Sequence, residues 1–124
     1  MQIHSKIAIH ILNIARVAAW TLAIAIVILS LVPTDLRPVT GAGQFLEHFA
    51  IFMVTGLAFG LGYGPKYISL ALALVGFSGV VEIAQTLAPG RHARLSDFII
   101  DAVAVTAGVA AAPALNFLGN LLGF

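Results

Sequence analysis

The sequence has no cysteine and very little charge. Asp, Glu, Lys and Arg together make up 9% of its 124 residues, against about a quarter in soluble domains. The lack of cysteine excludes disulfides, thiolate nucleophiles and thiolate metal sites. The formal net charge of +1 offers no basic surface to a nucleic-acid partner. Apolar residues fill 60% of the positions instead, and the mean hydropathy is +1.06.

These apolar residues are gathered into long runs with almost no charge, which is typical of transmembrane helices. Four such helices are predicted, at about 11–34, 46–63, 67–88 and 96–112. At a rise of about 1.5 Å per residue, each reaches or nearly reaches the ~30 Å thickness of the hydrocarbon layer. The sequence therefore predicts one all-α domain over residues 1–124, an integral membrane bundle of four transmembrane helices.

Prolines and polar residues suggest where the helices begin and end. Pro33 should stop the first helix, and Arg16 can lie within it if its side chain extends toward the interface. The N-terminal apolar run is longer than the roughly 7–15 residues of a signal-peptide core, so we expect the mature protein to keep it. Ser96 is the predicted N-cap of the fourth helix, with Asp97 in its first turn. Pro113 is expected to kink or end that helix.

Four spans return the chain to the side on which it begins. All five acidic residues fall in or near the opposite end: Asp35, Glu47, Glu82, Asp97 and Asp101. The end with the termini carries Lys6, Arg16 and Lys66. Lys and Arg divide three against three, so the positive-inside rule does not decide the orientation. Because Arg91 and Arg94 stand among acids that could retain them as partners, we expect both termini in the cytoplasm.

The acids near the helix ends define the main candidate site. Glu82 lies about two turns inside the third helix, and Gln85 at i+3 faces nearly the same way. Asp97 and Asp101, at i and i+4, share one face of the fourth helix. Charged groups at membrane depth are costly, so they normally face the bundle interior and find partners there. The sequence predicts a polar, ligand-binding pocket at one end of the bundle, lined by three helices. Its predicted residues are His48, Glu82, Gln85, Arg91, Arg94, Asp97 and Asp101.

These residues also have structural explanations. Glu82 and Gln85 could be hydrogen-bonded glue between helices, worth roughly 1 kcal/mol. Arg91 and Arg94 could pair with the aspartates of the fourth helix, or they could recognise an anion, because a guanidinium fork suits a phosphate. Both explanations stay open at the level of sequence.

Acid–base or phosphoryl chemistry is a further alternative for three of these residues. His48, Glu82 and Asp97 are the candidate catalytic groups. The sequence contains no HExxH motif and no evident nucleophile with an adjacent base. The same three residues could hold a metal, but their spacing matches no metal-site signature, so no metal site and no cofactor are expected.

The predicted second helix carries a GxxxG pattern at Gly56 and Gly60. This pattern predicts either close packing within the bundle or a homodimer. Four phenylalanines at helical spacing on the same helix are expected to be core or lipid-facing: Phe45, Phe49, Phe52 and Phe59.

Several motifs resemble those of a known family. They are "LSLVP" at the end of the first helix, "LEHFAIFMVTGLAFG" in the second, and "VVEIAQTLAPGRHARLSD" across the third helix and its loop. From Leu29 to Ala110 the chain resembles the VanZ-like family of small bacterial four-helix membrane proteins, whose named member is associated with teicoplanin resistance. In this family an acid and a lysine usually precede the histidine that corresponds to His48. Here Gln44 and Phe45 occupy these two positions. Four residues after Asp97, where the family usually has an asparagine, this chain has Asp101.

The resemblance implies a multi-pass protein of the bacterial inner membrane that acts in the cell envelope. In the first hypothesis, the arginines hold the anionic head of an amphiphile while the apolar bundle takes its tail. The amphiphile would be a lipid-linked cell-wall intermediate, a phospholipid or a lipoglycopeptide. In the second the protein is a small membrane enzyme, and in the third it is a structural or assembly subunit of a membrane complex.

Overall fold

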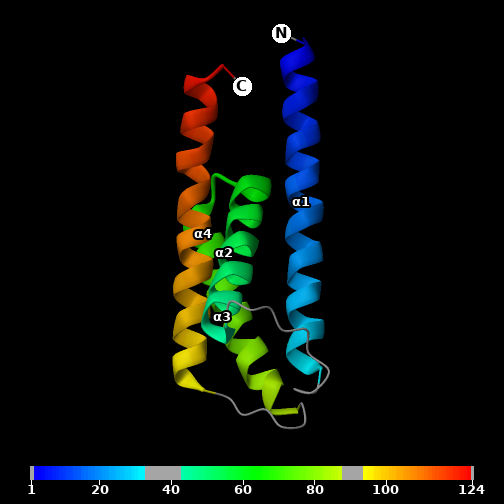
Figure 1. Cartoon of the computed structure of the whole chain (residues 1–124). Coiled ribbons are helices and arrows are strands. Elements are labelled where there is room, and N and C mark those ends of the chain that lie inside the picture. The colour runs from blue at the N-terminus through cyan, green and yellow to red at the C-terminus, as the bar shows by residue number, and fades with distance from the viewer. Residues whose placement is uncertain (1, 33–42, 88–93, 124) are drawn as a thin grey trace.

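The computed structural model describes residues 2–32, 43–87 and 94–123, and these residues form a bundle of α-helices (Figure 1). No strand occurs among them. The helices are α1 (Gln2–Leu31), α2 (Gln44–Tyr63), α3 (Tyr67–Ala84), which continues into the short 3-10 helix η2 (Gln85–Leu87), and α4 (Leu95–Leu121). The predicted all-α class and the four long helices are thereby confirmed.

Each long helix, with η2 counted as part of α3, is long and apolar enough to cross a membrane. The candidate spans are Ser5–Leu31, Phe45–Tyr63, Tyr67–Leu87 and Leu95–Leu121. Few of their residues are buried inside the bundle, and many large apolar side chains are exposed, including Ile68 at 80% and Ile83 at 70%. Such exposed apolar faces suit a lipid environment, and the chain is a multi-pass membrane protein.

The first helix is longer than predicted, because it begins at Gln2 and not near Ile11. Arg16 therefore lies in the middle of a helix. Its Nε donates a hydrogen bond of 2.8 Å to the carbonyl oxygen of Gly62 at the end of α2. This carbonyl belongs to the negative end of the α2 dipole, which favours a cation.

The prediction of Ser96 as the N-cap of the fourth helix is wrong, and so is the prediction that this helix ends near residue 112. Arg94, not Ser96, occupies the N-cap position, and its side chain does not cap the helix. Pro113 does not end α4, which continues to Leu121. A proline removes one backbone donor, and transmembrane helices tolerate this where neighbouring groups satisfy the backbone.

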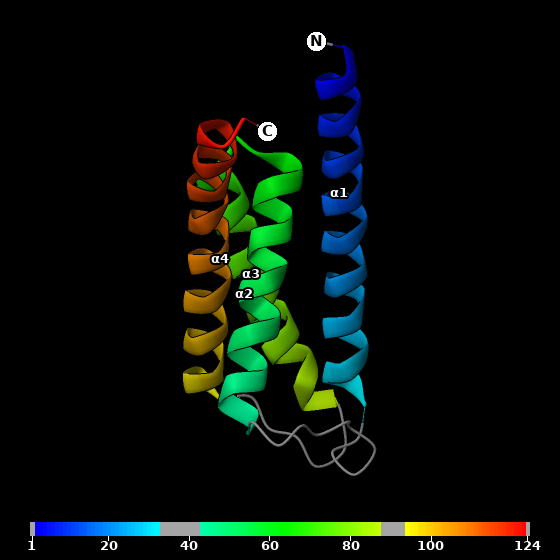
Figure 2. The ribbon, with the colours of Figure 1, turned by 45° about the horizontal axis from the view of Figure 1, so that its top comes forward.

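The helix α2 lies at the centre of the arrangement. It packs most extensively against α4 and also against α1, whereas α1 has only sparse contact with α3. In Figures 1 and 2 the long helices α1 and α4 extend past the α2–α3 hairpin at one end of the bundle. The beginning of α1 and the end of α4 both lie at that end, as four spans predict. The beginnings of α2 and α4 and the end of α3 lie at the other end.

Glycines allow α2 and α4 to approach closely. A Cβ atom at Gly56 would overlap the backbone oxygen of Val105, and one at Gly60 would lie 2.6 Å from the Cβ of Ala112. On α4, Gly108 packs in the same way against the backbone of α2. The prediction of packing within the bundle is confirmed. Dimerisation through Gly56 and Gly60 would require α4 to move away.

The core is built mainly from small and branched residues, and all four long helices contribute to it. Of the four phenylalanines on α2, Phe52 and Phe59 are buried and Phe45 is exposed, so both predicted environments occur. The buried hydroxyls of Thr55 and Ser78 donate to carbonyl oxygens of their own helices, at 2.6 and 2.7 Å. These bonds satisfy the two hydroxyl groups inside the core.

Candidate functional site

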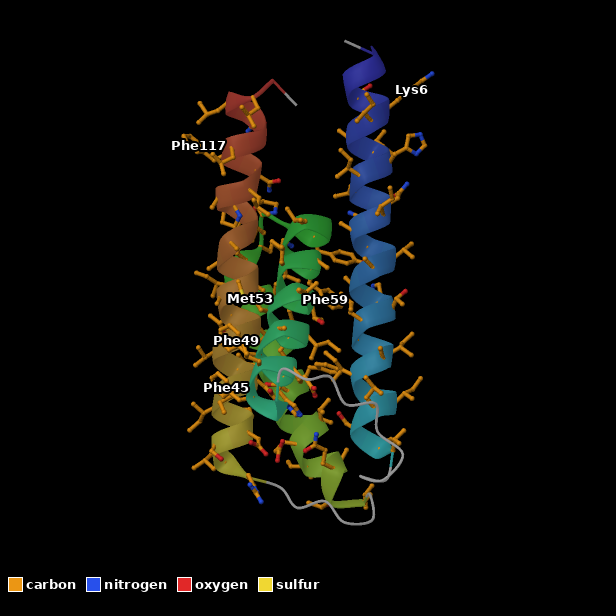
Figure 3. The ribbon with its side chains drawn as sticks, in the orientation of Figure 1. Lys6, Phe45, Phe49, Met53, Phe59 and Phe117 are labelled. Atoms are coloured by element: carbon orange, nitrogen blue, oxygen red, sulfur yellow. The ribbon has the colours of Figure 1, made fainter. Side chains whose placement is uncertain are left out.

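Polar side chains from three helices meet at the end of the bundle away from the chain termini. His48 lies near the start of α2, Glu82 near the end of α3, and Asp101 in the second turn of α4. The side-chain view in Figure 3 shows oxygen and nitrogen atoms gathered between the ends of these helices. Glu82 is 4% exposed and Asp101 is fully buried. Two carboxyl groups are therefore held inside an otherwise apolar bundle.

Asp101 is the partner of His48. Nδ1 of His48 lies 3.3 Å from Oδ1 of Asp101, and the side chains are 12% and 1% exposed. The imidazole ring also stacks on Phe52, with ring centroids 6.4 Å apart and an angle of 18° between the planes. A hydrogen on Nδ1 would donate to the carboxylate, which fixes the ring and leaves Nε2 for a ligand. Sequence reasoning placed His48 with Glu82 and Asp97 and missed this pair.

Glu82 contacts the beginning of α4. Its Oε1 accepts a hydrogen bond of 2.6 Å from the backbone nitrogen of Arg94, the N-cap residue. In a capping box, a glutamate three residues into the helix makes this bond. Here a glutamate from another helix makes it, and its charge lies at the positive end of the α4 dipole. This explains why α4 needs no cap from Ser96.

The second oxygen of Glu82 has a different environment. Oε2 is buried and has no hydrogen-bond partner among the residues that the structure describes. Asp97, Asp101 and His48 all lie within electrostatic range of this carboxylate. A buried acceptor without a partner is costly. Glu82 is thus only half satisfied by α4.

A small pocket opens beside these groups. It has a volume of about 190 Å³ and is lined by Phe45, His48, Arg94, Asp97, Ile100 and Asp101. The lining residues belong to α2 and to the beginning of α4, not to three helices as predicted. Glu82 of α3 supports the pocket through the backbone of Arg94. The predicted placement of Asp97 and Asp101 on one face of α4 is confirmed, because both line this pocket.

The remaining predicted site residues have separate positions. Gln85 is buried like Glu82, but it lies in η2 and does not line the pocket. Arg91 lies outside the described residues. In the part of the chain that the structure describes, no group of three or more His, Asp or Glu residues could hold a metal ion.

No family model, curated protein or solved structure matches this chain. The resemblance to the VanZ-like family therefore rests on the sequence motifs alone.

Proposed function

We propose that the protein binds the head group of an anionic membrane amphiphile in the pocket between α2 and the start of α4, at the outer end of the bundle. The observation that carries this proposal is the lining of the pocket. Arg94 offers a guanidinium to an anion, and the half-buried Asp97 offers carboxylate acceptors in the same pocket. The exposed rings and chains of Phe45 and Leu95 nearby are suited to the tail of a lipid.

The charges of the site favour particular head groups. Glu82, Asp97 and Asp101 outnumber Arg94 among the described residues close to the pocket. A purely anionic head would meet Arg94 but would also face repulsion from these acids. A head group that carries an anion together with hydroxyl or ammonium donors would satisfy both Arg94 and the acids. Lipid-linked cell-wall intermediates, aminophospholipids and lipoglycopeptides all have this combination, which also accords with the resemblance to teicoplanin-resistance proteins.

Native mass spectrometry from nanodiscs tests this function. The probe is a polyprenyl diphosphate that carries a sugar. We expect the wild type to retain this lipid and Arg94→Gln to lose most of it, because one charge-assisted bond is worth about tenfold in affinity. Lys6→Gln is the matched control, since it removes one positive charge from the other end of the chain. Equal retention by Arg94→Gln and Lys6→Gln would overturn the proposal.

The contact between His48 and Asp101 supports a second candidate, a small membrane enzyme. A carboxylate that orients an imidazole is the arrangement of a general base. In this candidate His48 exchanges a proton at Nε2 with a substrate in the pocket, and Glu82 and Asp97 shape the field around it. Incubation of the purified protein with the sugar-bearing lipid, followed by mass analysis of the lipid, distinguishes the two. A changed lipid mass that requires His48 favours the enzyme, and an unchanged mass favours binding alone.

A further inference from the structure

A further hollow lies near the turn between α2 and α3, with walls from α1, α2 and α3. It has a volume of about 520 Å³, within the roughly 300–1,000 Å³ of ligand sites. Its walls are apolar and include Phe59, Leu74 and Phe77. It exists because α1 packs mainly against α2 and α3 packs mainly against α4, whereas α3 has only sparse contact with α1 and α2. Phe59 projects from α2 toward α1 and forms the floor (Figure 3).

One end of this groove is polar and built from bonded side chains. Nε1 of Trp20 donates a hydrogen bond of 2.7 Å to the hydroxyl oxygen of Tyr63. The guanidinium of Arg16 lies 4.9 Å from the centre of the Tyr63 ring. Lys66 lines the groove beside them and is exposed. Since the Tyr63 oxygen accepts from Trp20, its own hydrogen is left to donate to a ligand.

The charge at this end has one sign. Lys6, Arg16 and Lys66 lie toward it, whereas the acids that the structure describes lie on the helix ends at the opposite side of the bundle. Trp and Tyr are also the residues that mark the membrane–water interface. The groove therefore joins a cationic, aromatic rim at the interface to an apolar channel that runs toward the membrane interior.

We propose that this groove binds one anionic phospholipid from the leaflet on the side of the chain termini. The phosphate lies at Lys66 and the Tyr63 hydroxyl, and one acyl chain lies against Leu74 and Phe77. A zwitterionic lipid fits less well, because no described acid lies here to receive its ammonium group. The bound lipid fills the space between α1 and α3 and joins the first helix to the α2–α3 hairpin. This site is separate from the pocket beside Arg94.

The single tryptophan of the chain makes the test specific to this groove. Trp20 lines it, so a lipid with brominated acyl chains that occupies the groove quenches the fluorescence of this residue. The protein is reconstituted in phosphatidylcholine nanodiscs that contain either brominated phosphatidylglycerol or brominated phosphatidylcholine. At equal mole fraction, we expect stronger quenching by brominated phosphatidylglycerol than by brominated phosphatidylcholine. Lys66→Gln should weaken this preference about tenfold, the loss of one charge-assisted bond.

Two further variants complete the experiment. Lys6→Gln removes the same charge from the part of α1 that extends past the hairpin (Figure 3), and it should keep the preference. Ala73→Phe fills the groove without adding a second tryptophan, and it should lower quenching by both brominated lipids. Equal quenching by the two lipids in the wild type, or equal loss in Lys66→Gln and Lys6→Gln, would overturn the proposal.

Discussion

The backbone nitrogen of Arg94 lies 2.6 Å from Oε1 of Glu82, and this bond joins the end of α3 to the beginning of α4. One oxygen of Glu82 therefore stabilises the start of α4, and the other has no hydrogen-bond partner among the described residues. The first oxygen explains why a carboxylate can be buried at this depth. The second oxygen is buried, and the carboxyl group lies within electrostatic range of Asp97, Asp101 and His48.

Substitutions of Glu82 should separate these two tasks. Glu82→Gln keeps an acceptor for the Arg94 nitrogen, so we expect a small change in stability together with a loss of ligand binding. Glu82→Leu leaves that donor unpaired and should destabilise the protein by about 1–3 kcal/mol. Thermal unfolding in detergent measures the stability of both variants. Ile83→Val, at an exposed position one residue further on, is the control. If Glu82→Gln melts several degrees lower yet binds normally, Glu82 is structural only.

The two aspartates of α4 should respond differently to substitution. Asp101 is fully buried and contacts His48, whereas Asp97 is half-buried at the pocket wall. We expect Asp101→Ala to lower the free energy of unfolding by about 1–3 kcal/mol, and Asp97→Ala to change it by about 0.5 kcal/mol or less. Denaturation of the two variants in the same detergent provides the comparison. Equal effects would mean that the contact between Asp101 and His48 contributes nothing.

The close approach of α2 and α4 makes a prediction about glycine. Gly56→Leu should destabilise the bundle by about 1–3 kcal/mol or more, because the added atoms would meet the backbone of Val105. Gly76→Ala is the matched control, since nothing lies within 4 Å of a Cβ there. It should be neutral or slightly stabilising, because alanine is the better helix former. Thermal unfolding of both variants checks this, and a tolerated Gly56→Leu would contradict the packing described above.

Topology can be tested without purification. Reporter tags at the two termini should give the same compartment, the cytoplasm, and a tag between α3 and α4 should give the opposite one. The reason is that four spans return the chain to its starting side. Opposite signals from the two termini would mean that one of the four helices does not cross the membrane.

A cellular assay tests the link to glycopeptides. In a teicoplanin-susceptible bacterial strain, expression of the wild type should lower susceptibility. Arg94→Gln and Glu82→Gln should remove this effect at equal protein levels, while Lys6→Gln should keep it. A wild-type protein that leaves susceptibility unchanged would refute the glycopeptide link, and the nanodisc experiment would then stand as the test of lipid binding.

The sequence by itself determined the class of this protein. Runs with almost no charge predicted four long helices, because hydropathy and helix rise are local properties of the chain. The even number of spans placed the chain ends together, and the positions of the acids located the candidate site at the other end. His48, Arg94, Asp97 and Asp101 were all predicted for that site, and all four line the pocket.

Only the tertiary structure decided which groups meet. His48 pairs with Asp101, and Glu82 binds the backbone of Arg94, a contact that no side-chain pattern reveals. Partners depend on how each helix is rotated about its axis and how far it is shifted along its neighbour. In a membrane protein, apolar residues cover the lipid-facing side of a helix as well as the core side. Hydrophobic periodicity therefore left rotation and register undetermined, and between α2 and α4 the close packing at Gly56, Gly60 and Gly108 restricts both.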